Sequence, residues 1–384
     1  MKPSTSLVTR KTGPGRKTLR IQRAKASSDE SSSSKVLGEE QELVTSKSRK
    51  LGGSDVLVAP IGIGAWSWGD TLYWNEGLTD GWNGEKLANA RGAYNAYLDL
   101  CESDPWIDTA EVYGGPIGGE SEKIIGRFMR DSMSVDGSGK PASRPKIATK
   151  FAALPWRVTS SSVVDACRQS LSRCQMESCE LYQQHWPGLW KNDEYLEGLE
   201  EVVKQGLAKS VGVSNFADKR LEKAYNRLKD LGVPLVSNQV HYNLLYRLPE
   251  QNGVLEKCKE LGVTLVAYSP LAQGVLSGKY SETNLPSGAR GQIYNEAFMR
   301  KARPLIELLK DIGESHGGKT PTQVALNWLL TNPDVTVIPG AKTKEQVEDI
   351  MGAVGWELDE GEVTELRKTA SKVPPVQGFP AEDL

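Results

Sequence analysis

The sequence predicts an α/β fold, a single (β/α)8 TIM barrel with extra loops on one face and a disordered N-terminal extension. From Leu51 onward, eight short apolar runs alternate with longer segments of helical period, and no linker interrupts them. Of the 384 residues, 38% are hydrophobic, which is enough to form one large core. The rival fold, a doubly wound parallel sheet, would normally carry G-x-G-x-x-G after its first strand, and the chain has no match to that spacing.

Residues 1–50 are predicted to precede the barrel, which takes residues 51–384. The first 28 residues hold eight Lys and Arg, many Ser and Thr and no acid, and such a segment cannot bury enough apolar surface to fold. A basic, hydroxyl-rich segment without an apolar core is typical of a transit peptide, and its hydroxyl content favours the chloroplast. The alternatives are a disordered tail of a cytoplasmic protein and a basic arm for nucleic acid. Residues 29–50 are a polar linker.

The strands and helices are expected in strict alternation. The expected strands are Ile61–Gly64, Trp106–Asp108, Lys146–Lys150, Leu181–Gln184, Ser210–Val213, Leu235–Asn238, Thr264–Tyr268 and Val335–Ile338. The expected helices are Glu85–Cys101, Glu120–Arg130, Ser161–Gln175, Asp193–Gln205, Ala217–Leu231, Glu250–Leu261, Thr320–Leu330 and Lys344–Val354. Thr320-Pro321 forms a helix start, while Gly206, Gly232 and Gly262 stand at helix ends.

Two segments that follow strands are longer than ordinary connections, and both should lie on the face where a barrel builds its site. One is Ser67–Gly84, whose tryptophans and Tyr73 we interpret as a lid over the pocket mouth, with packing as the alternative. The other runs from Leu271 to about Met299. A third insertion, Asp131–Arg144, follows a helix and should be exposed loop on the opposite face.

Composition excludes several classes of protein. Residues 1–50 carry 12 Lys and Arg against 5 Asp and Glu, which leaves 35 against 44 for the remainder, so the acidic body argues against nucleic acid as a partner. The longest apolar run, Leu57–Trp66, falls short of the ~18 residues of a membrane span, which predicts a soluble protein. The spacing of the five cysteines and three histidines predicts no disulfide framework and no metal site.

Polar side chains stand at or just beyond most of the expected strand ends: Asp108 and Tyr113, Lys150, His185, Ser214 and Asn215, Gln239, and Tyr268. Each has an ordinary explanation by itself, as a helix cap, a structural histidine or a solvated lysine. Strand ends of one barrel converge on one pocket, however, so together they predict an active site.

Four of these residue types can together deliver a proton to an oxygen that gains charge. A lysine ammonium held against Tyr113 favours its phenolate, and Asp108 beyond Lys150 keeps that ammonium charged. His185 can orient a substrate carbonyl toward the tyrosine. Since protein side chains have no hydride to give, a nicotinamide cofactor is required. Ser214, Asn215 and Gln239 could bond its carboxamide, with Tyr268 stacking on its ring.

At these residues the chain closely resembles the aldo-keto reductase superfamily. The matching stretches are IDTAEVYGG at 107–115, KIATKF at 146–151, LYQQHWPG at 181–188, VGVSNF at 211–216, NQVHYNLLYR at 238–247, AYSPLAQGVLSGKY at 267–280 and VIPGAKTKEQVED at 337–349. They cover nearly the whole body in the right order. The basic N-terminus and the loops look like plant plastid members, and potassium-channel β-subunits are a similar branch.

The resemblance implies a role for each matching position. Tyr113 would be the proton donor, Asp108 and Lys150 its tuning pair, and His185 the group that orients the carbonyl, while Trp66 would line the substrate site. The cofactor would contact Gly64, Ser214, Asn215, Gln239 and Tyr268, then Ser269, Pro270, Leu271, Gly274, Leu276, Gly278 and Lys279 at its pyrophosphate, and Gly340, Lys342 and Gln346 at its adenosine end. Two positions depart from the pattern of many members: Asp349-Ile350 at the adenine contact and Gln273 in the pyrophosphate loop.

The segment after the last strand predicts NADPH rather than NADH. Lys342, Thr343 and Lys344 stand at a helix N-terminus, where cations and free amides suit a 2′-phosphate. Lys342 is the better candidate of the two lysines because it lies closer to the strand end.

Three functions follow from these residues. The first is an NADP-dependent oxidoreductase that reduces aldehyde or ketone carbonyls, with a small-molecule substrate and neither nucleic acid nor membrane as partner. The second is a regulatory subunit that senses the nicotinamide redox state with little turnover. The third, a glycoside hydrolase, lacks a second carboxylate beside Asp108. His241 and His316 are interpreted as structural or exposed, and Cys167, Cys174 and Cys179 as core residues rather than a redox switch. The substrate and the oligomeric state are not predicted.

Overall fold

The computed structural model describes residues 47–71, 73–74, 82, 84–115, 118–133 and 144–376. Predictions for residues 1–46, for most of the stretch 72–83 and for the insertion 134–143 therefore lie outside the described residues. The disordered extension and its linker are among them, except for the last residues of the linker.

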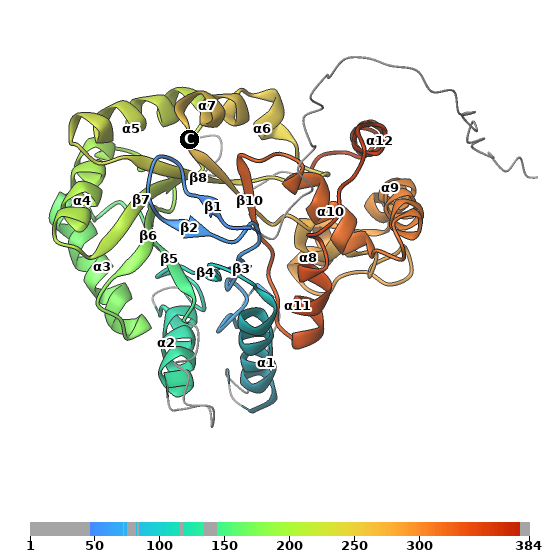
Figure 1. Cartoon of the computed structure of the whole chain (residues 1–384), viewed down its shortest axis with the longest axis horizontal. Helices are drawn as coiled ribbons and strands as arrows, with labels where there is room; N and C mark the ends of the chain where they lie inside the picture. Colours follow the sequence, from blue (N-terminus) through green and yellow to red (C-terminus); the bar gives the residue numbers. More distant parts are fainter. Residues whose placement is uncertain are drawn as a thin grey trace, which may run out of the picture. The chain divides into compact units, whose positions relative to one another are not determined.

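The central element is an eight-stranded parallel sheet whose strands follow one another in chain order, with helices around it (Figure 1). The strands are β3 (Ile63–Gly64), β4 (Trp106–Asp108), β5 (Lys146–Phe151), β6 (Cys179–Gln184), β7 (Ala208–Ser214), β8 (Leu235–His241), β9 (Thr264–Tyr268) and β10 (Val335–Ile338). The sheet closes between β3 and β10, where Gly62 N donates to Val337 O over 2.9 Å and Gly64 N donates to Pro339 O over 3.0 Å. The predicted (β/α)8 barrel is confirmed.

A short antiparallel hairpin of β1 (Arg49–Lys50) and β2 (Leu57–Val58) covers the amino ends of the barrel strands. Arg49 Nη1 donates to Val335 O over 2.5 Å at the start of β10. Gly52 N donates to Thr264 Oγ1 over 2.9 Å at the start of β9. The hairpin closes this end, so only the carboxyl ends of the strands are left to form a site.

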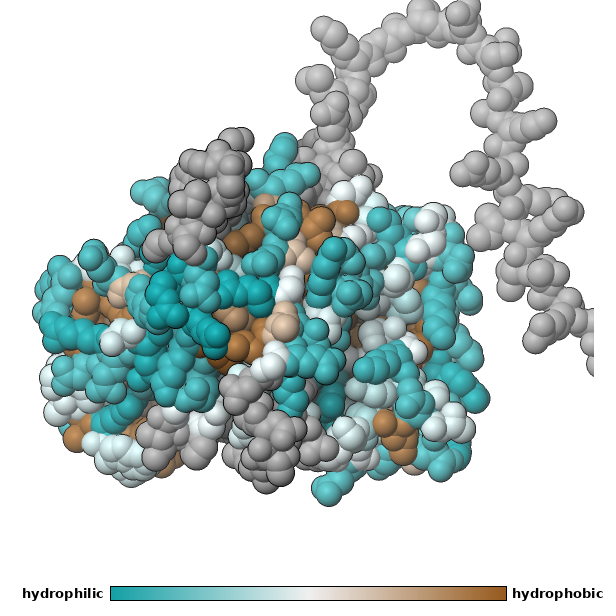
Figure 2. Space-filling model, turned by 90° about the horizontal axis from the view of Figure 1, so that it is seen from below, coloured by the Kyte–Doolittle hydropathy of each residue, from teal (hydrophilic) through white to brown (hydrophobic). Residues whose placement is uncertain are grey.

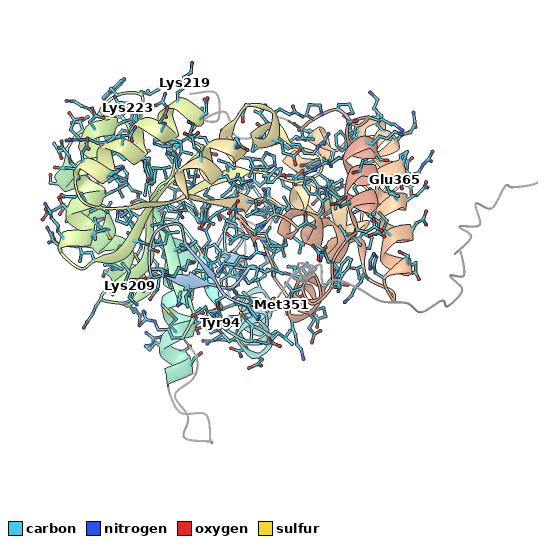
Figure 3. The ribbon with its side chains drawn as sticks, turned by 45° about the horizontal axis from the view of Figure 1, so that its top comes forward. Tyr94, Lys209, Lys219, Lys223, Met351 and Glu365 are labelled. Atoms are coloured by element: carbon cyan, nitrogen blue, oxygen red, sulfur yellow. The ribbon has the colours of Figure 1, made fainter. Side chains whose placement is uncertain are left out.

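Helices surround the barrel, and most lie where the sequence predicts them. Their bounds are α1 Gly84–Leu100, α2 Glu120–Met133, α3 Ser160–Cys174, α4 Asn192–Lys204, α5 Asp218–Asp230, α6 Leu248–Gln251, α7 Val254–Leu261, α8 Ala289–Ile293, α9 Glu296–Ser315, α10 Pro321–Leu330, α11 Lys344–Met351 and α12 Glu360–Ala370, with a 3-10 helix η1 at Ala272–Ser277. On α5, Lys219 and Lys223 point away from the barrel (Figure 3), whereas Leu221 is buried toward it.

The helix prediction was wrong at one point, and it missed three helices, α8, α9 and α12. The single helix expected over Glu250–Leu261 is two, because Gly253 adopts a left-handed φ of 84° and the Asn252 side chain caps the new helix at Val254 N. The 20-residue helix α9 was not predicted at all, although Asn295 caps it in the usual way. Pro304 inside α9 weakens the helical signal in its sequence.

On the face of the molecule shown in Figure 2, hydrophilic residues predominate and apolar residues lie in small groups. Among the helices of the described residues, none is both long and apolar enough to cross a membrane. The five cysteines are free and buried. Burial raises the pKa of the Cys174 thiol well above its usual value, which agrees with a packing role.

Candidate active site

The strand-end residues converge on one place, as the sequence predicts. Asp108 ends β4, Tyr113 follows on the next turn, Lys150 lies in β5 and His185 directly follows β6. Lys150 is fully buried, and its Nζ lies 2.5 Å from Asp108 Oδ1, 2.8 Å from Thr109 O and 3.2 Å from the Tyr113 hydroxyl. The three N–H groups of the ammonium therefore donate hydrogen bonds to one carboxylate, one backbone carbonyl and one phenol.

The protonation states follow from burial and from this contact. Burial disfavours the charge on Lys150, but Asp108 and Tyr113 outweigh it and hold the pKa of Lys150 above its usual value. Burial raises the pKa of Tyr113, and Lys150 only partly opposes this rise. Lys150 thus lowers the pKa of Tyr113, as the sequence predicts, but burial raises that pKa by more. Tyr113 is thus a neutral phenol with a proton to give.

His185 is a neutral ring beside this phenol. Burial lowers its pKa well below the usual value, with Lys150 as a second cause. Its ring meets that of Tyr113 edge-on, with the centroids 5.6 Å apart, and its Nδ1 is buried without a hydrogen-bond partner. An unsatisfied polar atom at this place suits an absent ligand.

A second group gathers at the ends of β7, β8 and β9. Tyr268 OH donates to Asn215 Oδ1 over 3.1 Å, Asn215 Nδ2 lies 3.2 Å from Ser214 Oγ, and Ser214 Oγ donates to Gln239 O over 2.8 Å. His241, one of the two histidines without an expected role, lies flat against the Tyr268 ring with the centroids 5.4 Å apart. Burial lowers the pKa of His241 to about 4, so a neutral ring supports the tyrosine.

The segment after β9 is shaped by unusual backbone conformations. Three residues other than glycine, Ser269, Ala272 and Gln273, have positive φ values of 49°, 47° and 55°. Such strain is concentrated at ligand sites, and left-handed residues in a tight loop can turn several backbone N–H groups toward one anion. Among the expected pyrophosphate contacts, Leu276 is fully buried, so only its backbone can serve.

Arg290 is a functional candidate that the sequence analysis missed. Its side chain is 8% exposed and lies over the Trp74 ring, 4.8 Å from the centroid. Within the described residues it has no carboxylate partner, and its Nε has no hydrogen bond. Lys342 Nζ lies over the same ring at 5.7 Å. Because a buried cation without a carboxylate is unfavourable, Arg290 suits an anionic ligand. One arginine in a long loop gives no sequence signal.

The segment after β10 is organised by its own side chains. Gln346 Oε1 accepts from Lys342 N over 2.7 Å, and Thr343 caps α11. Lys344 instead pairs with Glu348 at 3.5 Å on the exposed side of that helix. Asp349, one of the two departures, accepts from Thr320 Oγ1 over 2.5 Å and so holds the start of α10. Of the two lysines, Lys342 lies nearer the site.

Gly64 and Trp68 have structural contacts that the sequence does not predict. At Gly64, a Cβ would meet Ile338 O at 2.7 Å, so the close approach there is that of β10. Trp68 in the expected lid is fully buried, and its Nε1 donates to Ala341 O over 2.8 Å, which makes it a packing residue.

Aromatic rings surround the tyrosine. Trp66 stacks on Tyr73 with the centroids 4.9 Å apart and lies 6.3 Å from the ring of Tyr113, while Trp186 tilts against His185 at 4.7 Å. Tyr73 OH donates to Gln273 Oε1 over 3.0 Å, which links the segment after β3 to the loop after β9. The residues thus form an aromatic wall beside Tyr113.

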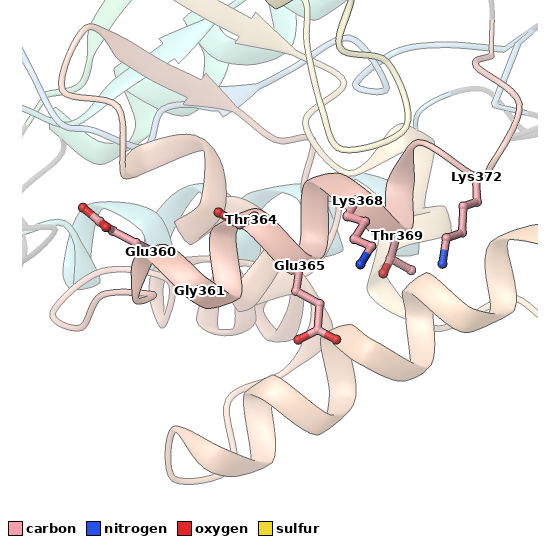
Figure 4. A pocket seen from close by; sticks show the side chains of 7 residues that line it. All are labelled: Glu360, Gly361, Thr364, Glu365, Lys368, Thr369 and Lys372. Carbon is pink, nitrogen blue, oxygen red and sulfur yellow. The ribbon is translucent and has the colours of Figure 1, made fainter. Parts of the chain in front are cut away.

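A separate hollow of about 560 Å³ lies along α12 (Figure 4). It is lined by Glu360, Gly361, Thr364, Glu365, Lys368, Thr369 and Lys372. Mixed acids and bases on one exposed helix are typical of a solvated face, and none of them approaches the strand ends.

Sequence comparison places the chain among known reductases. The model of the Aldo/keto reductase family matches residues 60–371. The chain is 37% identical over 328 residues to "Pyridoxal reductase, chloroplastic" of Arabidopsis thaliana, which covers 83% of this chain and 84% of that protein. It is 30% identical over 271 residues to L-glyceraldehyde 3-phosphate reductase of Escherichia coli, which covers 65% of this chain and 74% of that protein.

Solved structures agree with the sequence relatives. A thermostable aldo-keto reductase in complex with the inhibitor epalrestat is 28% identical, with a TM-score of 0.64 over 84% of this chain and 99% of that chain. An aldo/keto reductase from Klebsiella pneumoniae in complex with NADP and acetate is 25% identical, with a TM-score of 0.61 over 84% of this chain and 94% of that chain. On its fold, its strand-end residues and its sequence, the chain belongs to the aldo/keto reductase family.

Proposed function

We propose that this protein reduces aldehyde or ketone carbonyls to alcohols, with NADPH as the hydride source and Tyr113 as the proton donor. The observation that carries the proposal is the buried chain from Asp108 through Lys150 to the Tyr113 hydroxyl, with contacts of 2.5 Å and 3.2 Å. As a member of the aldo/keto reductase family, the protein is an oxidoreductase.

The residues of the chain act on the proton and on the substrate oxygen. Bound nicotinamide supplies the hydride. The Tyr113 hydroxyl donates its proton to the carbonyl oxygen, and the Lys150 ammonium stabilises the phenolate that remains. Asp108 keeps that ammonium charged and in place. The neutral His185 has one N–H that can donate to the same oxygen and aim it at Tyr113.

The polar groups around the site fit a phosphorylated dinucleotide. Ser214, Asn215 and Gln239 would hold the carboxamide, and Tyr268 would stack on the nicotinamide. The strained loop Ser269–Lys279 would bind the pyrophosphate, while Arg290 and Lys342 would meet the 2′-phosphate. The Klebsiella pneumoniae structure, which contains NADP, supports this cofactor.

The aromatic wall favours a planar aromatic aldehyde as substrate. Trp66, Tyr73, Trp74 and Trp186 surround the approach to Tyr113, and flat rings stack on such walls in offset or edge-on arrangements. The Arabidopsis thaliana relative is named a pyridoxal reductase, and pyridoxal is a flat heteroaromatic aldehyde. Pyridoxal is therefore the first substrate to test.

The protein is proposed to act in the chloroplast after removal of its basic N-terminal segment. The chloroplastic name of the Arabidopsis thaliana relative supports this location, and cytoplasmic residence is the alternative. Since Arg49 holds the barrel through Val335 O, the mature chain should retain it. N-terminal sequencing of the protein from isolated chloroplasts tests this, and an intact Met1 would contradict it.

A substrate screen tests the activity. Purified protein is mixed with NADPH or NADH and with pyridoxal, benzaldehyde, an aliphatic aldehyde and a quinone, and the loss of reduced nucleotide is followed. We expect turnover with NADPH, fastest with the aromatic aldehydes. Tight NADPH binding without turnover on any carbonyl would instead favour the redox-sensing regulatory subunit.

A further inference from the structure

We propose that Gln183 is a positioning residue for this reduction, which holds the second carboxylate oxygen of Asp108 from inside the barrel. The inference rests on the proposed function and deepens it. Gln183 belongs to none of the residue sets that the sequence analysis assigned to chemistry or to cofactor.

Asp108 uses its two oxygens differently. Oδ1 faces Lys150, while Oδ2 accepts from Gln239 Nε2 over 2.8 Å and from Gln183 Nε2 over a longer 3.4 Å. Both glutamines are buried, with at most 1% of their surface exposed. In the register of β5 and β6, Lys150 lies beside Gln183, so the two side chains point to the same face. A buried carboxylate oxygen needs such donors, because water is absent.

The direction in which the Gln183 amide points is set by Ser237. Ser237 Oγ donates to Gln183 Oε1 over 3.3 Å, so the NH2 end of the amide is the end left for Asp108. Gly212 lies between these two residues in the register of β6, β7 and β8. A Cβ at Gly212 would come within 2.1 Å of Ser237 Oγ, so a glycine is required for this contact.

Under the proposed function, Gln239 and Gln183 have different roles. Gln239 also serves the nicotinamide carboxamide, so its hold on Asp108 must adapt when the cofactor binds. Among the described residues, the side chain of Gln183 has hydrogen bonds only with Ser237 and Asp108. It therefore keeps the carboxylate aimed at Lys150 in both states, and through Lys150 it keeps the Tyr113 hydroxyl in place.

The first test is Gln183→Met, which keeps the length of the side chain and removes the amide. We expect kcat to fall about ten- to a hundredfold, the effect of losing a hydrogen bond to a charged group, while the Kd for NADPH stays unchanged. Gln184→Met is the matched control, because Gln184 is equally buried on β6 but bonds to Trp186 O and Asn192 instead. A Gln183→Met protein with wild-type kcat would overturn the proposal.

The second test is Gln183→Glu, which keeps the shape and can still accept from Ser237. In this variant the introduced carboxyl group faces the carboxylate of Asp108, and it can donate a hydrogen bond to Asp108 only when it is protonated. Two facing carboxylates bind a proton more readily than one, so this donor is restored as the pH falls. The other titratable groups on this side are Lys150, which contacts Asp108, Tyr113, which contacts Lys150, and His185, whose ring meets that of Tyr113. We expect the kcat of this variant to rise toward wild type at acidic pH. A pH profile parallel to that of wild type would contradict the proposal, including in the case where Gln183→Met fails to fold.

A readout without turnover separates this inference from the proposed function. The absorbance of tyrosinate is titrated in wild type and in Gln183→Met, each compared with its own Tyr113→Phe variant. A shifted Tyr113 titration in Gln183→Met supports the positioning role even if no carbonyl is reduced. An unshifted titration overturns it even if the wild type is an active reductase.

Discussion

Two buried ion pairs lie on opposite sides of β5, and only one of them reaches the site. Lys150 points into the barrel, where it contacts Asp108 and Tyr113. Its neighbour Thr149 points outward and donates to Glu122 Oε1 over 2.5 Å, while Arg173 Nε donates to Glu122 Oε2 over 2.6 Å. Both carboxylates are buried beside a cation, so burial and charge alone do not distinguish them.

The difference is the third member of each group. Beside Lys150 stands a phenol that we propose gives its proton to a substrate, whereas beside Glu122 stands the Thr149 hydroxyl, which donates to that carboxylate. Glu122 joins α2 to α3 and β5, and its contacts are complete without a ligand. A buried ion pair with shifted pKa values therefore indicates function only where a group that can exchange a proton connects the pair to the pocket.

The largest expected effect is that of Tyr113→Phe, which keeps the ring and removes the proton. Carbonyl reduction should fall by about 10²-fold or more, the scale of general acid catalysis, with cofactor affinity and thermal stability nearly unchanged. Steady-state kinetics measure the loss of carbonyl reduction, and a fluorescence titration with NADPH measures the cofactor affinity. Near-normal turnover would remove Tyr113 from the mechanism.

Removing the cation from each pair sharpens the comparison. Lys150→Met and Arg173→Met each leave a buried carboxylate without its partner, which should cost about 3–5 kcal/mol of unfolding free energy. Only Lys150→Met should also lower the turnover of the protein that remains folded, by a factor similar to that of Tyr113→Phe, because the phenol then donates its proton less readily. Denaturant unfolding measures the loss of stability in each variant, and kcat per folded protein measures the loss of turnover. An inactive but folded Arg173→Met would show that the outward pair also serves the site.

Lys342→Ala tests a cation that is expected to meet a ligand. Because charge-assisted bonds to phosphate are strong, NADPH should bind about ten- to a hundredfold more weakly and NADH nearly as before. Lys344→Ala is the matched control, since that lysine pairs with Glu348 at the surface. Equal losses for both nucleotides would contradict the assignment of the 2′-phosphate to this loop.

The smallest expected effect is the pH dependence that Glu122 contributes to stability. Burial raises its pKa, although Arg173 opposes this. A carboxyl whose pKa is raised by folding adds stability below its unfolded pKa and loses it as the pH rises through the folded value. Wild type should therefore lose more unfolding free energy than Glu122→Gln between pH 4.5 and neutrality. A larger loss in the variant would show that Arg173 outweighs burial.

The barrel, the order of its strands and the residues at their ends could all be predicted from the sequence. Strand and helix periods differ, so their alternation specifies eight units, and strand ends of a parallel barrel meet on one face. Asp108, Tyr113, Lys150 and His185 could be named for that reason. The period did not reveal the break at Gly253, because a single left-handed residue leaves the apolar pattern almost intact.

The partner that each buried polar atom meets depends on the packing of the whole fold and could not be predicted from the sequence. Gln183 reaches Asp108 across the barrel interior, and Arg290 comes to Trp74 from the short helix α8, more than 200 residues away. Both contacts depend on strand stagger and loop path, which residue types do not encode locally. The net pKa shift of Tyr113 has the same origin: Lys150 lowers it, but burial by residues from many strands raises it more. Burial is a sum over the whole fold, so no local pattern could supply its size.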